Sequence, residues 1–221
     1  LIRKTKILAK IKVLRHIRNR TSEQKQKQTV SSQSNHSFQK VVAIACSTGG
    51  PKALAGILST LPADFPYRIL ISQHIENSFI ASLVDWINHV SPLTVKTPRE
   101  GESLAPATAY ISPANKNMIV DFSGKIIFDD MEPTDIYHPS CNKLLSSVGQ
   151  VFGKNSIGVV LTGMGNDGLV GIKTIKSNGG ITIAQDEASS IVFGMPREAI
   201  DSGCIDTVLT LADISKHLAH L

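Results

Sequence analysis

Short apolar runs alternate with helical patterns along most of this chain. Four runs are short and largely apolar, and the first of them is continuously so: 41–46 (VVAIAC), 67–72 (YRILIS), 156–162 (SIGVVLT) and 181–185 (ITIAQ). Such runs are typical of strands that are buried on both faces of a parallel sheet. With helices between them, they predict an α/β fold, a doubly wound, mostly parallel sheet with helices on both faces.

The connecting segments carry the start and stop signals of helices. Pro51 suits the first turn of a helix, Ser140 can cap another, and Gly153 can end it. Further helices are expected after the run GMGNDG, over 196–203 and at the end of the chain, the last one following a short strand. In the helix expected over 76–90, the predicted buried stripe consists of Phe79, Leu83, Trp86 and Ile87.

An insert interrupts the alternation between the second and third of these runs. Two short β segments, 93–97 and 107–112, lead to the pattern MIVDFSGKIIF, which predicts a β-hairpin that turns at Ser123-Gly124. The expected domain over 40–221 is therefore a doubly wound sheet with a hairpin insert.

Charge separates residues 1–39 from this domain. Residues 1–40 hold 11 of the 23 Lys and Arg but only Glu23 among the 18 acidic residues, a net charge of +10; the rest of the chain carries 12 basic and 17 acidic residues, a net charge of −5. Residues 1–20 have a rough helical stripe between basic positions, and the polar stretch after them is typical of a linker. A basic arm for nucleic acid or an anionic membrane is one interpretation. We favour an interdomain helix and linker, because residues 1–20 contain no aromatic side chain for base stacking.

Composition excludes several other classes. The chain is 42% apolar and 19% charged, which is ordinary for a globular domain. Its three cysteines, Cys46, Cys141 and Cys204, are scattered, so we expect neither a disulfide framework nor a zinc site. The same pattern fits a reducing compartment, and we expect a cytoplasmic location. No apolar run reaches the ~18–20 residues of a membrane span, so no membrane insertion is expected. The first residue is Leu1, and we expect a fragment whose N-terminal part is missing.

Three reactive side chains follow the predicted buried strands. Ser47 follows the first, His74 the second, and Asp167 lies in the glycine-rich run after the third. Because ligands bind at the carboxyl edge of open α/β sheets, these groups should meet at one edge. A hydroxyl, an imidazole and a carboxylate are the nucleophile, base and orienting anion of a serine hydrolase. The glycines beside Ser47 would let a substrate carbonyl approach, and amides at the helix N-terminus would bind the oxyanion.

Each residue also has a simpler interpretation. Ser47 can cap the following helix or line an anion site, His74 can be a structural histidine, and Asp167 lies in ordinary turn chemistry. The runs STGG and GMGNDG can serve a phosphate- or nucleotide-binding module, although neither matches a P-loop or G-x-G-x-x-G. An α/β-hydrolase would need its acid before its histidine, for instance Asp206 and then His217.

Four stretches together resemble a known family. ACSTGGPKAL, ISQHI, VVLTGMGNDG and TIAQDEASSIVFGMPREAI are similar to the bacterial chemotaxis receptor methylesterases, in the same order from Val41 to Leu221. The resemblance implies hydrolysis of glutamyl methyl esters on methyl-accepting chemotaxis receptors, with release of methanol, and deamidation of receptor glutamines. It also implies that a receiver domain precedes the basic linker. A receptor-binding scaffold without turnover remains an alternative.

The resemblance assigns roles to particular residues. Ser47 would be the nucleophile, His74 the base and Asp167 the orienting acid, with Thr48, Gly49, Gly50 and Met164 around the reacting carbonyl. No metal, organic cofactor or nucleic acid is expected. This chain departs from the family pattern at Asn117, where histidine is common, and at His138 and Asn142, where arginine and aspartate are common. These departures affect the expected receptor docking and cleft charge but leave the three reactive residues in place.

Overall fold

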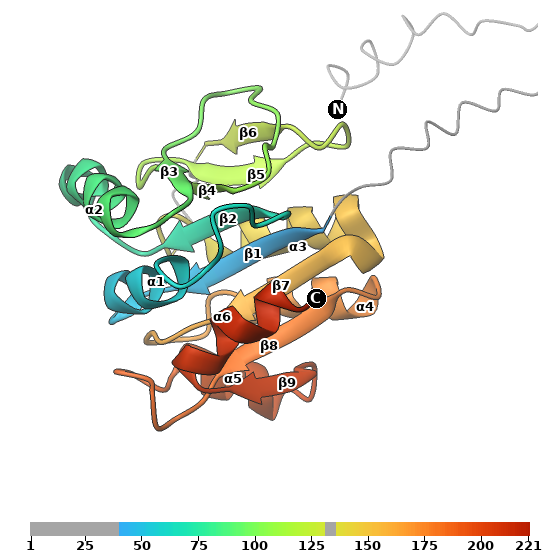
Figure 1. Ribbon diagram of the computed structural model, residues 1–221. Helices are drawn as coiled ribbons and strands as arrows, with labels where there is room; N and C mark the ends of the chain where they lie inside the picture. Colours follow the sequence, from blue (N-terminus) through green and yellow to red (C-terminus); the bar gives the residue numbers. More distant parts are fainter. Residues whose placement is uncertain (1–39, 131–135) are drawn as a thin grey trace, which may run out of the picture. The chain divides into compact units, whose positions relative to one another are not determined.

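The computed structural model describes residues 40–130 and 136–221. The predicted basic helix and linker over 1–39 lie outside the described residues. The main sheet has seven strands in the order β3-β4-β2-β1-β7-β8-β9, and every neighbouring pair in it is parallel (Figure 1). Its strands are β1 (Val41–Cys46), β2 (Arg68–Gln73), β3 (Thr94–Lys96), β4 (Thr108–Ile111), β7 (Ser156–Val160), β8 (Ile181–Gln185) and β9 (Thr207–Leu209).

Helices cover both faces of this sheet, and each face has its own apolar cluster. One cluster includes side chains of α1 (Gly50–Leu58), α2 (Asn77–Val90) and α6 (Leu211–Ala219). The other includes side chains of α3 (Cys141–Phe152), α4 (Leu169–Ser177) and α5 (Met195–Asp201). The expected doubly wound fold with helices on both faces is confirmed.

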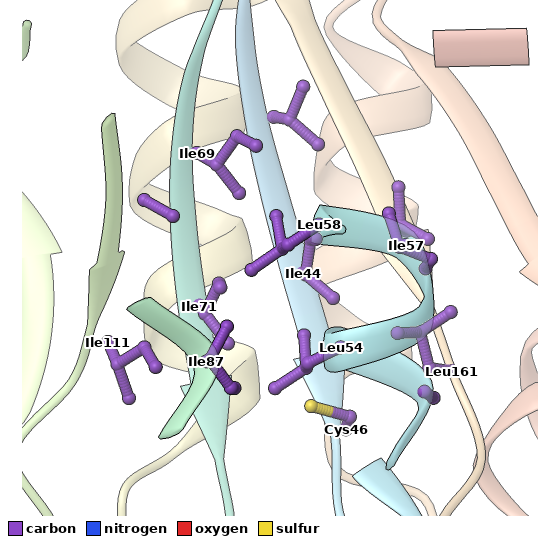
Figure 2. Packing of buried hydrophobic residues seen from close by; sticks show 14 of the residues in the cluster. Ile44, Cys46, Leu54, Ile57, Leu58, Ile69, Ile71, Ile87, Ile111 and Leu161 are labelled. Atoms are coloured by element: carbon purple, nitrogen blue, oxygen red, sulfur yellow. The ribbon is translucent and has the colours of Figure 1, made fainter. Parts of the chain in front are cut away.

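The buried run of β1 supplies both clusters. Val42, Ile44 and Cys46 point into the first cluster, whereas Val41, Ala43 and Ala45 point into the second. Alternate side chains of a strand lie on opposite faces, so a strand at the centre of the sheet must be apolar at every position. Figure 2 shows Ile44 and Cys46 against Leu54, Leu58 and other members of the first cluster.

The predicted hairpin forms a small separate sheet. Strands β5 (Asn117–Val120) and β6 (Ile126–Asp129) pair antiparallel, and Gly124 in their turn has φ 77°. Met118, Val120 and Ile126 bury their side chains in the same cluster as α3. The helix α3 begins after Ser140, whose hydroxyl accepts the Lys143 N–H, and ends at Gly153, where a short 3₁₀ turn (Gly153–Asn155) follows.

Two details of the sequence prediction were wrong. In α2 the buried residues are Ile80, Leu83 and Ile87, while Phe79 and Trp86 are 60% and 46% exposed. Apolar residues stand on adjacent positions of this helix, so the pattern alone did not decide which row faces the sheet. The third buried strand ends at Val160 rather than at residue 162.

Within the described residues, no helix is long and apolar enough to cross a membrane.

The strand order places the functional edge. From β1 the chain passes to β2 and on to β3 at the edge of the sheet, and then comes back to β4 between them. After the hairpin it crosses to β7 on the other side of β1. The carboxyl ends of β1 and β7 therefore lie at the point where the winding reverses, which is where open α/β sheets bind their ligands.

Candidate active site

Ser47 is the first residue after β1, and its main chain is held from both neighbouring strands. The register pairs Cys46 with Gln73, so Ser47 and His74 follow their strands at the same level. The Ser47 N–H donates to Thr162 O (3.1 Å), and the His74 N–H donates to Cys46 O (3.1 Å). The helix α1 begins at Gly50 without a side-chain cap, so Ser47 does not have the capping role that was one interpretation of it.

The side chain of Gln73 links the main chain at Ser47 to that at His74. This residue was not identified from the sequence. Its side chain is buried, and Nε2 donates to both Ser47 O (3.0 Å) and His74 O (2.7 Å). One carboxamide therefore holds the carbonyl groups of both predicted reactive residues. A glutamine at the end of a buried strand is a weak signal, because only the tertiary structure shows which carbonyls it meets.

His74 and Asp167 are in direct contact. His74 Nε2 lies 2.8 Å from Asp167 Oδ2, and the Asp167 side chain is fully buried while that of His74 is 14% exposed. Because the Nε2–H group of His74 donates to this carboxylate, the other ring nitrogen, Nδ1, is the one left to accept a proton from a nucleophile or to contact a substrate. Among the described residues no hydrogen bond joins Ser47 Oγ to His74; catalytic hydrogen bonds often form only when substrate is present.

Asp167 is held as a carboxylate by several donors. The backbone N–H groups of Cys141 (2.7 Å) and Asn142 (2.9 Å) donate to it from the first turn of α3. Burial by itself raises the pKa of this carboxyl group, but the hydrogen bonds from His74, Cys141 and Asn142 outweigh burial, and the net pKa is lowered. A fixed anion beside an imidazole is the electrostatic arrangement that stabilises imidazolium during proton transfer.

Asn142 fixes the loop that carries Asp167. Its side-chain Oδ1 accepts the N–H groups of Gly168 (3.0 Å), Val170 (2.9 Å) and Gly171 (3.1 Å) at the start of α4. These amides are the donors that a phosphate would need at this helix end. Because they are already used, the structure disfavours GMGNDG as a phosphate loop. This departure from the family pattern keeps an acceptor oxygen in place.

The other departures also take structural positions. Asn117 is buried, and its Oδ1 accepts the Ser140 N–H (2.8 Å) just before α3. His138 is exposed and lines a cavity of about 540 Å³ together with His74. Asn117 therefore supports the loop beside the site, and His138 is the departure that faces a cavity.

The residues expected around a reacting carbonyl occupy different environments. Thr48 is exposed, and Met164 is 74% exposed. Within the described part of the chain, the N–H groups of Thr48, Gly49 and Met164 have no hydrogen-bond acceptor. Gly50 differs, because it is buried and its N–H already donates to Ser47 O (2.8 Å).

Gly163 allows the loop after β7 to approach Ser47. A Cβ atom at this position would lie 2.8 Å from Ser47 Cβ and 2.3 Å from Met195 Sδ, so only glycine fits. The Gly163 N–H donates to Val192 O, and Gly163 O accepts from Gly194 and Met195. The position of the next amide, that of Met164, is therefore fixed by its neighbours.

His74, Asp167 and Cys141 each offer one possible metal ligand, and these atoms lie within 4.8 Å of one another. However, both the His74 and the Cys141 amide contacts already use Asp167 Oδ2. Burial and the nearby Asp167 carboxylate raise the pKa of the Cys141 thiol, which disfavours the thiolate that metals bind. The geometry thus favours a hydrogen-bonded histidine and aspartate over a metal centre.

Among the described residues, no hydrogen bond or ion pair joins Asp206 to His217, the pair that an α/β-hydrolase would need. Asp206 accepts hydrogen bonds from Thr182 and pairs with Lys176, and His217 lies in α6. Asp206 precedes β9, which lies three strands from β1 in the sheet, whereas Ser47 follows the carboxyl end of β1. The arrangement that the fold does bring together is Ser47, His74 and Asp167 at one edge of a doubly wound sheet, which is the class of site found in serine hydrolases.

Comparison with known proteins agrees with this class. The family model of the CheB methylesterase matches residues 42–218, and the chain therefore belongs to the CheB methylesterase family. The resemblance drawn from the four sequence stretches is confirmed. The crystal structure of the Thermotoga maritima CheB methylesterase catalytic domain is similar, with a TM-score of 0.79 and 35% identity over 82% of this chain and 98% of that one.

Curated relatives are similar at about the same level. A protein-glutamate methylesterase/protein-glutamine glutaminase of Paramagnetospirillum magneticum is 41% identical over 82% of this chain and 51% of its own length. The protein-glutamate methylesterase FrzG of Myxococcus xanthus is 40% identical over 98% of this chain and 64% of its own length. The chain spans about half the length of the first of these relatives.

Proposed function

We propose that this chain hydrolyses the γ-methyl esters of glutamate residues in methyl-accepting chemotaxis receptors, with deamidation of receptor glutamines as a second reaction. The observation that carries this proposal is the 2.8 Å contact between His74 Nε2 and the buried Asp167 carboxylate, beside a serine at the switch point of the sheet. Membership of the family supports the same reaction, and two of its curated relatives are named for it.

In the proposed mechanism His74 is the base. Its Nδ1 accepts the proton of Ser47 Oγ as the oxygen attacks the ester carbonyl, and Asp167 stabilises the imidazolium. Nδ1 then returns the proton to the departing methoxide, so methanol leaves and an acyl-enzyme remains on Ser47. Water attacks this ester with the same base, releasing the glutamate carboxylate and restoring the serine hydroxyl. An amide substrate would follow the same steps and release ammonia.

We also propose that main-chain amides bind the oxyanion. The N–H groups of Met164 and of Thr48 or Gly49 are the candidates, because no acceptor among the described residues uses them. Each such donor contributes about 10²–10³-fold in rate in related sites. Gly50 is a weaker candidate, since its N–H already donates to Ser47 O.

The wider organisation of the protein stays a prediction. We propose that residues 40–221 are the catalytic domain, that residues 1–39 link it to a receiver domain, and that the reaction takes place in the cytoplasm. Chemotaxis receptors would be the partners of the catalytic edge. No step of the proposed mechanism calls for a metal or an organic cofactor.

Methanol release from membranes that carry methylated chemoreceptors tests the proposal. Ser47→Ala and His74→Ala should each lower kcat by about 10⁴–10⁶-fold, because triad members act as a unit. Ser59→Ala is the matched control: Ser59 is exposed at the end of α1, and its loss should leave the rate unchanged. Equal release by the wild type and Ser47→Ala would refute Ser47 as the nucleophile. Release by neither, with receptor binding intact, would refute the esterase and favour the scaffold.

A further inference from the structure

The ring of Tyr137 lies on the face of the His74 imidazole. The two rings are nearly parallel, with an interplanar angle of 3° and centroids 5.3 Å apart. Tyr137 is half-buried in the loop before α3, and with His74 it lines the cavity of about 540 Å³. The imidazole is therefore bounded by Asp167 and Cys141 at Nε2 and by an aromatic ring on one face.

The hydroxyl of Tyr137 reaches the loop that carries Asp167. It donates to Asn166 Oδ1 at 3.4 Å, which is long for a hydroxyl donor. A Cβ atom on Gly165 would come within 2.9 Å of the same hydroxyl, so the side chain packs tightly against this loop. One residue thus contacts the base through its ring and the neighbourhood of the acid through its hydroxyl.

A single hydrogen bond does not fix the plane of an imidazole. The second side-chain torsion of histidine has a broad minimum, so a ring held only at Nε2 can swing about that point. A parallel aromatic face restricts this swing, and such offset-stacked pairs are favourable beyond the area that they bury. The plane of the ring also decides where Nδ1 points, because Nε2 is held by Asp167.

We propose that Tyr137 is a positioning residue, whose ring holds the His74 imidazole so that Nδ1 faces Ser47 while Nε2 meets Asp167. This inference rests on the proposed esterase function. The ring, rather than the hydroxyl, carries the effect, because the stack is close and parallel while the hydrogen bond is long.

Two variants of Tyr137 separate ring from hydroxyl, with methanol release measured over a range of receptor concentrations. Tyr137→Leu should lower kcat by about 10–100-fold, since a misplacement of about 1 Å costs rates of that order, and should change KM little. Tyr137→Phe should retain kcat within about threefold. Tyr67→Leu is the control: Tyr67 is a half-buried tyrosine that packs on Phe65 just before β2, at the opposite edge of the sheet, and its kcat should stay at the wild-type value.

A readout without turnover accompanies the kinetics. The ring current of Tyr137 should shift the His74 ring protons upfield in the NMR spectrum, and this shift should persist in Tyr137→Phe and disappear in Tyr137→Leu. The His74 signals are assigned from their absence in His74→Gln. Thermal unfolding of each variant confirms that the measured kcat refers to folded protein.

The outcomes are distinct. A loss of kcat in Tyr137→Leu that Tyr137→Phe rescues supports the positioning role. An unchanged kcat in Tyr137→Leu, an effect confined to KM, or an equal loss in Tyr137→Phe would overturn it while the proposed function stands. An inactive wild type would refute the proposed function and this inference together, and the NMR shift would then report only on the ring contact.

Discussion

Replacing Gly50 with alanine places a methyl group where the Gln73 side chain lies. The added Cβ would be 1.9 Å from Gln73 Oε1, 2.9 Å from its Cδ and 3.0 Å from Cys46 Cβ. Within the described structure, Oε1 is buried and has no hydrogen-bond partner, so the clash itself breaks no bond of that atom. The same carboxamide, however, donates through Nε2 to the carbonyls of Ser47 and His74.

The cost follows from these contacts. To reach an ordinary separation of about 3.4 Å, the carboxamide must move by more than an ångström, which breaks both hydrogen bonds at about 0.5–1.5 kcal/mol each. Overpacking of a closed site adds about 1–3 kcal/mol. A total of about 2–6 kcal/mol lowers the Tm of a domain this size by about 5–20 °C. Because Ser47 and His74 lose the hydrogen bonds that the Gln73 carboxamide makes to both of their carbonyls, activity should fall by about 10²-fold.

Thermal unfolding followed by circular dichroism, together with methanol release, measures both effects. Gly56→Ala is the matched control in the same helix, where the added Cβ would meet only Leu211 Cδ2 at 3.5 Å. This control should gain up to about 1 kcal/mol from helix propensity and keep full activity. A Gly50→Ala variant that unfolds at the wild-type temperature and retains wild-type activity would refute the role of Gln73 in holding Ser47 and His74.

Two further predictions concern Asp167 and its loop. The folded state lowers the pKa of Asp167, so its stabilising contribution is complete above the unfolded pKa, about 4, and is lost as the pH falls through the lower folded value. Acid titration of the free energy of unfolding should show this loss, and Asp167→Asn should show a flatter curve below pH ~4; parallel curves would contradict it. Asn142→Ala leaves three α4 amides without their acceptor and should cost about 1–2 kcal/mol in urea unfolding, whereas an unchanged midpoint would count against this cap.

Much of the architecture was predictable because the strands at the centre of the sheet are apolar throughout. The run 41–46 contacts helices on both sides, so it had to lie inside a parallel sheet. The hairpin and the caps at Ser140 and Gly153 were predictable because glycine and serine have local backbone and hydrogen-bonding preferences. The buried face of α2 was predicted only in part, because Phe79 and Ile80 are both apolar and their neighbours in space decide which is covered.

The sequence by itself determined the order of strands and helices and the positions of Ser47, His74 and Asp167 after their strands, since these follow from local patterns. Only the tertiary structure decided which groups meet. The contact of His74 Nε2 with Asp167, the carboxamide of Gln73 between two carbonyls and the ring of Tyr137 on the imidazole join residues that are far apart in the chain or whose side chains turn toward specific partners. Such contacts depend on strand register and on the packing of α3 against the sheet, and no local pattern of residues encodes them.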